Sequence, residues 1–513
     1  MFNSKTIEIT GAPQPKSLIA RVGRAPPFLY LILTLICKVS ADKAVDFVER
    51  DIRLRRFCRL HENFTVEECD SLDMANFTHV KNATYALEED FVTTTNIISI
   101  PLSLLVISLA APWSDRHGRL CLIKTSIVGY LMAALCYTLF VRFESWPVEV
   151  LLAATVLRSV AGGPSFFPMA FFSMTVDKTD SKTRPLKIGV GVNCLLLTRL
   201  IGYGTGLACE AKPFWALIMA LLYYILALFM SNEFLQEDEV EHGARVPPRD
   251  NNPVVDLLHP KNVSDLWAVA LKARPQRQRV HLLLILFVTF FVLFSPPSFL
   301  AEWEMTYLGW GRDQFIVVTA VYLICGQIFT IVVIRLTEKS PIPDCLLAAT
   351  AEGMIVLQDL MLITVVRPDL SGIVYGAMVF SIWHNLSDVG IRLALSNIGG
   401  KGEIGKIFGI LAMQETVMTF AQKMAFRSFW DATRDYLVTS QHVLSAFFGV
   451  LNSAVLFGVF MSERHLKKNG RQNEKIRTII EDCDKYKSGN NSEGTVKSGQ
   501  GHVNMAFETN HKY

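Results

Sequence analysis

Three ionisable residues recur at every fourth position of one long apolar stretch: His384, Asp388 and Arg392. At about 100° per residue they lie on one face of a helix, so Asp388 can pair with both neighbours. Charges inside a membrane span are costly, and those that occur there generally serve binding or transport. Arg392 offers a planar fork suited to a carboxylate or phosphate. The alternative is a structural ion pair that locks this helix to a neighbouring one.

Other ionisable residues stand in neighbouring apolar stretches. Glu415 is either a carboxyl that carries a proton, because burial disfavours its charge, or the partner of a basic residue. His384 joins it as a candidate for proton coupling, because histidine titrates near neutral pH. Arg199 is a second candidate for binding an anionic substrate. Further charged residues within these stretches are Lys38 and Asp42, which are spaced to pair, Arg158, for which a structural role is favoured, Glu352 and Asp359.

The nonapeptide Ala111 to Arg119 reads Ala-Pro-Trp-Ser-Asp-Arg-His-Gly-Arg and separates two apolar stretches. Gly118 permits a tight turn, and the charges of Asp115, Arg116 and Arg119 are too costly to place in lipid. The arginine excess in so short a loop favours the cytoplasmic side. The pattern resembles the loop between helices 2 and 3 of the major facilitator superfamily, with Ala111 in the first glycine position. In that superfamily the aspartate and arginine link the loop to helix ends and separate when the carrier changes state; an ordinary charged hairpin is the alternative.

The composition, 51% hydrophobic and only 19% charged, indicates an all-α protein embedded in a membrane. Apolar stretches of about 20 residues can each cross the bilayer. They predict twelve spans, near 26–48, 91–112, 121–142, 147–174, 186–209, 213–231, 281–303, 314–335, 343–366, 371–397, 407–430 and 442–462. A long polar linker separates the first six from the last six, the layout of two homologous six-helix halves.

Basic residues that follow spans 4, 8, 10 and 12 mark one side of the membrane as cytoplasmic. The first apolar run lacks a small-residue cleavage site, so we interpret it as a retained span. The resulting organisation is a cytoplasmic N-terminal segment (1–25), a first half (26–231), a cytoplasmic linker (232–280), a second half (281–462) and a disordered cytoplasmic tail (463–513). A short amphipathic piece of the linker, around 262–272, is suited to lie along the membrane.

The first loop, 49–90, is the long one on the predicted outer side. It holds three N-x-[ST] sequons, which predict glycosylation at Asn63, Asn76 and Asn82. Cys58 and Cys69 lie in the same loop, and their spacing would allow a local bridge in an oxidising compartment.

Several classes of function find no support in the sequence. No zinc-ligand spacing and no nucleophile–base arrangement occurs, so we predict neither an enzyme nor a metal or cofactor site. Gly400 to Lys406 matches a phosphate-binding pattern, but Ile407 follows where magnesium binding requires serine or threonine. A net charge of +3 gives no indication of nucleic-acid binding.

The chain resembles solute carrier family 46, the group that contains the proton-coupled folate transporter. The sharper matching pieces are Ala111–Arg119, Asp177 to Arg184, Ile391-Arg392-Leu-Ala-Leu-Ser and Gly402-Glu403-Ile-Gly405. The resemblance implies a twelve-helix major facilitator fold, with Arg392 at the position of the arginine that contacts substrate in the folate carrier.

The chain also departs from the folate carrier at four places. The acid of span 5 is missing, with Val192 near its position. The acid of span 4 has no counterpart between Val150 and Val176, and the histidine of span 7 has none between Leu282 and Trp303. The resemblance therefore does not extend to the folate carrier's proton route or to folate as the substrate. Gly309 replaces the cysteine that bridges to the first loop in that carrier, which leaves the local Cys58–Cys69 bridge as the simple option.

The sequence thus predicts a secondary transporter that moves a small organic anion by alternating access. The anion is folate-like, nucleotide-like or muropeptide-like, and protons are a candidate coupling ion. Arg392, Asp388, His384 and Arg199 are the predicted substrate-binding residues, and Asp115, Arg116, Gly118 and Arg119 the gating loop. The competing interpretation is a membrane receptor or scaffold that no longer transports. We place the protein in the plasma membrane, with the lysosomal membrane as the alternative.

Overall fold

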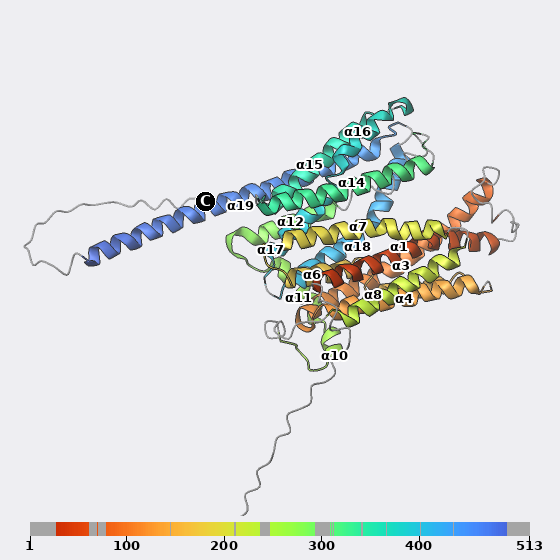
Figure 1. The fold of residues 1–513 in the computed structure, drawn as a ribbon, viewed down its shortest axis with the longest axis horizontal. Helices are drawn as coiled ribbons and strands as arrows, with labels where there is room; N and C mark the ends of the chain where they lie inside the picture. The colour runs from red at the N-terminus through yellow and green to blue at the C-terminus, as the bar shows by residue number, and fades with distance from the viewer. Residues whose placement is uncertain are drawn as a thin grey trace, which may run out of the picture. The chain divides into compact units, whose positions relative to one another are not determined.

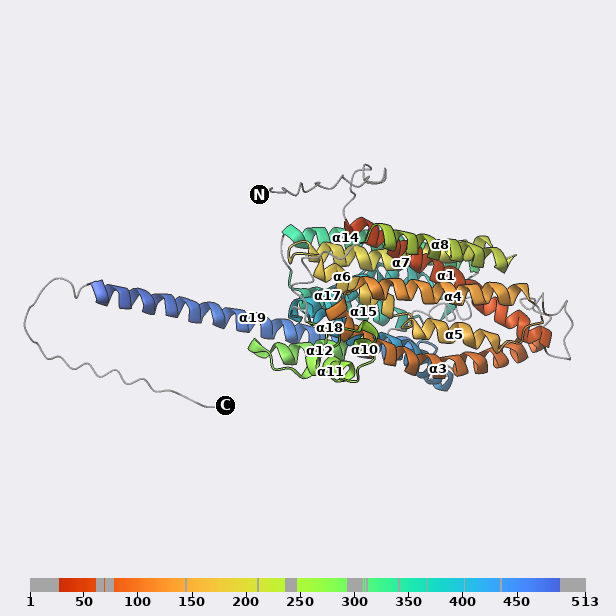
Figure 2. The ribbon, with the colours of Figure 1, turned by 90° about the horizontal axis from the view of Figure 1, so that it is seen from below.

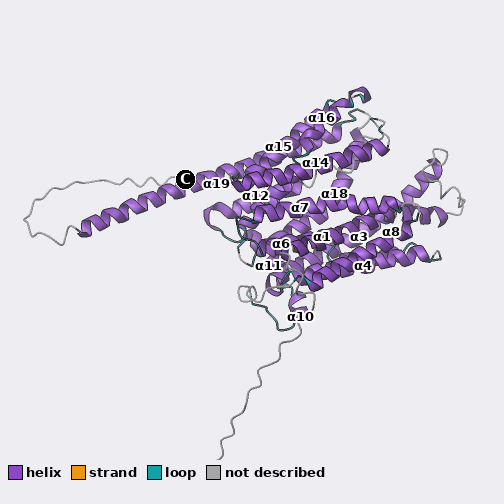
Figure 3. Cartoon of the chain, viewed as in Figure 1, coloured by secondary structure: helices purple, strands orange, loops and turns teal. Residues whose placement is uncertain are grey.

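Every predicted span contains helix, and helix is the regular secondary structure throughout the described part of the chain (Figure 3). The computed structural model describes residues 27–60, 69, 78–143, 145–209, 212–235, 247–292, 308, 310, 312–339, 342–365, 367–400, 402–433 and 436–489. Seven of the described helices are long and apolar enough to cross a membrane by length and composition. The chain is therefore an all-α, multi-pass membrane protein, as the hydropathy pattern predicts.

The first half consists of six spans made from seven helices. They are α1 (Pro27–Leu60), α3 (Thr78–His117), α4 (Leu120–Arg142), α5 (Val150–Val160), α6 (Phe166–Asp177), α7 (Arg184–Ala208) and α8 (Pro213–Glu233). The fourth span is divided between α5 and α6 because Gly162 and Gly163 take φ values of +90° and +72°, which end the first helix before Pro164.

The second half repeats this layout. Its helices are α12 (Gln278–Val292), α14 (Arg312–Lys339), α15 (Asp344–Ile363), α16 (Gly372–Ser381), α17 (His384–Ile398), α18 (Ile404–Thr433) and α19 (Ser440–Gly489). The span at 371–397 is divided between α16 and α17, so that α17 begins at His384.

The two halves pack against each other along pairs of helices far apart in the sequence. Within the first half α1 lies against α7 and α8, and within the second half α15 lies against α17 (Figures 1 and 2). Between the halves, α3 contacts α18, α7 contacts α14 and α17, and α6 contacts α18. The residues predicted to bind substrate lie on α7 and α17, and the proton-coupling candidate Glu415 lies on α18; these three helices all take part in contacts between the halves.

The linker agrees with the sequence prediction in its local structure, and the tail differs from it. The linker forms α10 (Pro253–Leu257), α11 (Lys261–Leu271) and a short turn of 3₁₀ helix, η3 (Pro275–Arg277), so the predicted amphipathic piece is a helix. Disorder is predicted from 463, yet α19 continues to Gly489. This segment is rich in lysine, glutamate and arginine, which are good helix formers. A prediction of disorder from polar composition does not take that helix propensity into account. Residues from Phe460 onward form a separate unit of the chain.

Candidate functional site

Arg392 lies at the centre of a cluster of charges on α17. Its Nε donates a hydrogen bond to Oδ1 of Asp388 at 2.9 Å, and its Nη2 donates to Oε1 of Glu415 at 2.6 Å. The guanidinium also lies over the ring of Phe172 on α6, 4.5 Å from the ring centroid. We call Arg392, Asp388 and Glu415 the triad. It connects α17 and α18 of the second half and contacts the first half through Phe172.

The three members of the triad differ in accessibility. The side chain of Asp388 is 42% exposed, whereas those of Arg392 and Glu415 are 6% and 15% exposed. The carboxylate of Asp388, one turn before Arg392 on α17, is therefore the most accessible member of the triad. One guanidinium and two carboxylates leave the triad with one net negative charge when both acids are ionised.

The structure assigns partners that the spacing left open. Glu415 has a basic partner, Arg392, and the proton-carrying role of Glu415 remains a prediction. His384 behaves differently from the expectation that it pairs with Asp388. It interacts with Asp388 and with Arg199 electrostatically, and no hydrogen bond joins it to the described residues. Glu415, the second acid that pairs with Arg392, lies on α18. The spacing of residues along α17 therefore could not reveal it.

Arg199 stands apart from the triad. It lies on α7, and its side chain is exposed. Its charge acts on His384 and on Tyr322 of α14, both in the other half, and on Lys43 of α1 in its own half. The structure therefore places Arg199 and His384 close enough for their charges to interact across the two halves, without joining either to Arg392 by a hydrogen bond.

The gating loop connects the halves at the face predicted to be cytoplasmic. Arg119 forms an ion pair with Asp115 and another, at 3.0 Å, with Asp177 at the end of α6. Oδ1 of Asp115 also accepts a hydrogen bond from the backbone amide of Gly405, at 3.0 Å. Gly118 takes a φ of +101°, a conformation that favours glycine, and so turns the chain between α3 and α4. Asp115 and Arg119 thus join helix ends of both halves.

Gly405, in the first turn of α18, allows this helix to approach the gating loop closely. A Cβ atom built there would lie 2.1 Å from Nη1 of Arg119 and 2.8 Å from Oδ1 of Asp115. A side chain at this position would push the loop away from the helix, so the contact requires glycine. The last glycine of the family-like sequence Gly402-Glu403-Ile-Gly405 is therefore explained by its close contact with Arg119 and Asp115.

Arg116 does not join the Asp115 contacts; it binds the linker. Its Nε and Nη2 each donate to the carboxylate of Asp256 on α10 at 3.0 Å, and Nη2 also donates to Oδ1 of Asn262 at 2.6 Å. Nε2 of His117 lies 2.7 Å from Asp256. Trp113 donates from Nε1 to the carbonyl oxygen of Pro253 at 2.9 Å. The N-terminal part of the linker is therefore held on the end of α3.

The other end of the linker is held on the second half. Nζ of Lys272 lies 2.6 Å from Oε1 of Glu403, and Nη2 of Arg274 lies 2.7 Å from Oε2. Arg274 also donates to the carbonyl oxygen of Ile398 at 2.9 Å. Residues 247–277, which we call the strap, thus connect α3 of one half to the α17–α18 turn of the other. Sequence reasoning missed the strap because its ion pairs join residues more than a hundred positions apart.

The pKa values of two carboxyl groups in the strap contacts, Asp256 and Glu403, are shifted from their ordinary values. Burial raises the pKa of Asp256, but hydrogen bonds from Arg116 and His117 outweigh it and the net pKa is lowered. Burial likewise opposes ionisation of Glu403, and its bonds from Lys272 and Arg274 lower the pKa overall. Both acids therefore remain ionised under mildly acidic conditions, and their ion pairs continue to hold the strap against the two halves.

A further set of ion pairs stabilises the first half. Arg158 lies 2.9 Å from Glu49, which also accepts a hydrogen bond from Tyr137 and pairs with Arg53. Arg53 in turn lies 2.9 Å from Glu88. The structural role predicted for Arg158 agrees with this network. Lys38 pairs with Asp42 at 2.6 Å, as their spacing predicts.

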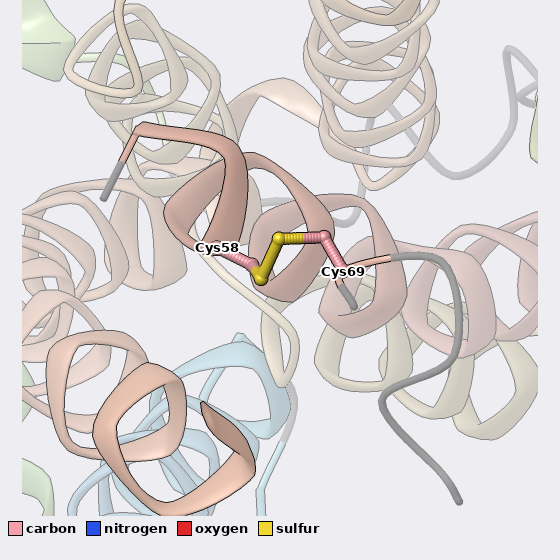
Figure 4. The surroundings of a disulfide bond; sticks show 2 residues. All are labelled: Cys58 and Cys69. Carbon is pink, nitrogen blue, oxygen red and sulfur yellow. A yellow bond between two sulfur atoms is a disulfide. The ribbon is translucent and has the colours of Figure 1, made fainter. Parts of the chain in front are cut away.

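The first loop contains a disulfide between Cys58, near the end of α1, and Cys69 (Figure 4). This is the local pairing that the sequence left as the simple option. Asn63 and Asn76 lie outside the described residues, and Asn82 lies on α3. Glycosylation at these three positions remains a prediction.

No group of three or more His, Cys, Asp or Glu side chains is placed to hold a metal ion among the described residues. A groove of about 410 Å³ lies on α15 and α16 and is lined by Leu357, Leu360, Met361, Thr364, Ile373 and Phe380. Its lining is almost wholly apolar and offers no charge to an anion, so it suits lipid chains better than the predicted substrate.

The family model that matches this chain is that of the Major Facilitator Superfamily, over residues 74–421. Among curated proteins, the chain is 22% identical to the lysosomal proton-coupled steroid conjugate and bile acid symporter SLC46A3 of Gallus gallus, covering 71% of this chain and 79% of that protein. It is 23% identical to the proton-coupled folate transporter of Rattus norvegicus, covering 71% of this chain and 77% of that protein. Solute carrier family 46 member 2 of Canis lupus familiaris is 24% identical, over 69% and 76%.

Solved structures show the same fold at lower identity. The human organic anion transporter MFSD10 (TETRAN) superposes with a TM-score of 0.64 at 16% identity, covering 84% of this chain and all of that one. A bacterial homologue of the iron transporter ferroportin, in an outward-facing state, gives a TM-score of 0.60 at 14% identity, covering 85% and 100%. These proteins are transporters, not enzymes, which agrees with the absence of catalytic motifs in the sequence.

Proposed function

The chain belongs to the major facilitator superfamily of transporters, with relatives in solute carrier family 46, and on that premise we propose that it moves a small organic anion by alternating access. The observation that supports this proposal most is the triad. Arg392 presents a guanidinium beside an exposed carboxylate, at a point where α17 and α18 meet α6 of the other half. A guanidinium is the side chain best suited to a carboxylate, sulfate or phosphate.

The charge of the triad supports proton coupling as part of this proposal. With both acids ionised the triad is negative and repels an anion. Protonation of Glu415 makes the triad neutral and frees one side of the Arg392 guanidinium for the substrate. A substrate anion and a proton therefore stabilise each other's binding, which is the thermodynamic requirement for symport. His384, one turn before Asp388, is the second candidate for the titrating group.

The contacts between the halves suggest which state of the transport cycle this is. Asp115 with Gly405, Arg184 with Asn397 at 3.2 Å, and the strap all join the halves at the face predicted to be cytoplasmic. We interpret this arrangement as the outward-facing state, with its cytoplasmic side closed. Transport then requires these contacts to separate, and the gating role of Asp115 and Arg119 belongs to this proposal.

The test is uptake by the purified protein in liposomes. The substrate panel is folates, nucleotides, muropeptides and sulfated metabolites, each radiolabelled, with empty liposomes as the control. Accumulation of one class above the empty-liposome level supports the proposal. Binding of a panel member without any movement across the membrane would favour the alternative, a receptor on a carrier fold.

The membrane in which the protein acts is a separate proposal. One relative, SLC46A3 of Gallus gallus, is a lysosomal symporter. We propose the plasma membrane, with the lysosome as the alternative. Surface biotinylation of the full-length protein, compared with co-localisation with a lysosomal marker, distinguishes the two.

A further inference from the structure

Glu352 is a buried acid that belongs neither to the triad nor to the gate. It lies on α15 with only 3% of its surface exposed, in the middle of a predicted membrane span. Ser387 of α17 donates its hydroxyl to Oε1 of Glu352, and Asn452 of α19 donates from Nδ2 to Oε2 at 3.3 Å. Both partners are neutral, and they come from two other helices of the second half, α17 and α19.

The charged groups around Glu352 do not neutralise it. Within the described residues no lysine, arginine or histidine forms an ion pair with it. On its own helix the nearest acting charge is Asp359, a second acid, which pairs with His442 of α19 at 3.3 Å. On α17 the charges of Asp388 and Arg392 are joined to each other. An isolated carboxylate inside a membrane protein is costly, whereas the protonated acid is not.

The partners of Glu352 can serve both forms of the acid. Asn452 is 1% exposed, and its Oδ1 has no hydrogen-bond partner among the described residues. When Glu352 is ionised, the Asn452 nitrogen donates to it; when Glu352 is protonated, rotation of the amide brings the free oxygen round to accept. The Ser387 hydroxyl can likewise donate or accept. A site that satisfies both forms is suited to bind and release a proton.

The helix α17 connects Glu352 to the triad. Ser387 is directly followed by Asp388, whose side chain pairs with Arg392. One turn along, Gly390 contacts α15 so closely that a Cβ there would lie 2.9 Å from Cβ of Ala348 and 2.9 Å from its backbone nitrogen. Because the two helices touch at backbone level, a change in the Glu352–Ser387 bond alters the position of α17, and with it Asp388 and Arg392.

We propose that Glu352, with Ser387 and Asn452, is a proton-binding site that controls the triad through α17. The carboxylate takes a proton from a hydronium ion on one side of the membrane, forming an O–H bond and leaving water, and returns the proton to water on the other side as hydronium. No electron moves. This inference rests on the proposed transport function for its consequence, but proton binding itself can be measured without a substrate.

The first experiment is infrared difference spectroscopy of the full-length protein in lipid nanodiscs, titrated with pH. It follows the carbonyl stretch of protonated carboxylic acids. Wild type shows a titrating band that Glu352→Gln removes, while Asp359→Asn, a matched change on the same helix, retains it. A band that is the same in wild type and Glu352→Gln contradicts the proposal.

A pair of variants at Ser387 tests the geometry without changing the acid. Ser387→Ala removes one donor to the carboxylate, so the midpoint of the Glu352 band moves to higher pH. The loss of one hydrogen bond to a charged group corresponds to about one to two pH units. Ser387→Thr keeps the hydroxyl and keeps the midpoint near that of wild type. Equal midpoints in Ser387→Ala and wild type contradict the assigned contact.

The second experiment connects the site to transport. Liposomes with wild type or Glu352→Gln take up the panel of folates, nucleotides, muropeptides and sulfated metabolites with and without an inward proton gradient. We expect Glu352→Gln to lose the stimulation by the gradient while retaining exchange of the same solute at equal pH. Stimulation retained in Glu352→Gln contradicts the proposal. If wild type moves no member of the panel while the infrared band titrates as expected, the proposed transport function is contradicted and the proposed proton-binding site at Glu352 is supported.

Discussion

The carboxylate of Asp115, at the end of α3, accepts a hydrogen bond from the backbone amide of Gly405, 290 residues away at the start of α18. The first amides of a helix lack partners within the helix and carry the positive end of its dipole. Asp115 therefore caps a helix of the other half while it also pairs with Arg119. One acid thus links the two halves of the transporter at the gating loop.

Removing this acid should weaken the closed gate more than the fold. We expect Asp115→Ala to cut the transport rate more than surface expression. A hydrogen bond to a charged group contributes about 1.5–3 kcal/mol, so the closed form should lose roughly tenfold or more in population relative to the open one. Spin labels at the exposed positions Lys182 and Gly400, on a background without free cysteines, report the distance between the halves. Equal loss of transport and expression would indicate a folding role instead.

Gly405 offers a sharper test of the same contact. In Gly405→Ala the new methyl group collides with Arg119 and Asp115, so we expect the two spin-labelled positions to move apart and transport to fall. Gly204→Ala on α7 is the matched control, because nothing lies within 4 Å of a Cβ built there. A Gly405→Ala protein with the distance distribution and uptake of wild type would show that the close approach is not required.

The sequence predicts some features better than others, for physical reasons. The positions of the spans follow from hydropathy because the thickness of the bilayer sets the length of each span locally. The pairing of Lys38 with Asp42 follows from helix periodicity. The partners of Arg116 and Glu415 do not, because Asp256 and Arg392 come from distant segments and only tertiary packing brings them close. The Asn452 contact with Glu352 is of the same kind.

The strap should respond to acid in a defined direction. The pKa values of Asp256 and Glu403 are lowered in the folded protein, so their contribution to docking is fully present above the ordinary carboxyl pKa of about 4. It is lost as the pH falls through the lowered values. We expect hydrogen exchange of residues 253–271, corrected for intrinsic rates, to stay slow from about pH 8 to pH 5 and to accelerate below about pH 4. In Asp256→Asn the amides should exchange faster already at neutral pH, and an unchanged rate there would contradict the strap's dependence on this acid.

The outer loop should carry both covalent modifications. Peptide mapping without reduction should recover Cys58 joined to Cys69, and free thiols at both positions would contradict the bridge. Glycosidase treatment should shift the mobility of the full-length protein on gels, and the shift should shrink stepwise in Asn63→Gln, Asn76→Gln and Asn82→Gln. Asn385→Gln, a sequon within a predicted span, is the control that should leave the shift unchanged.

The role of the triad can be separated from that of charge alone. Arg392→Lys retains the positive charge but loses the two-pronged geometry that reaches Asp388 and Glu415 together. We expect the apparent affinity for the transported anion to fall by about tenfold or more, as for one lost hydrogen bond to a charged group, while expression is maintained. An apparent affinity equal to that of wild type would place the anion elsewhere, with Arg199 as the next candidate.

The measurement that tests the central proposal most directly is uptake of the anionic panel into liposomes, with and without an inward proton gradient, by wild type, Glu415→Gln and His384→Ala. We expect wild type to accumulate an organic anion faster with the gradient. Glu415→Gln should retain uptake but lose most of this stimulation, because it fixes the triad in its neutral form. Gradient-stimulated uptake that survives both substitutions would remove Glu415 and His384 from the proton route. Absence of uptake by wild type under every condition would contradict the transport of an organic anion itself.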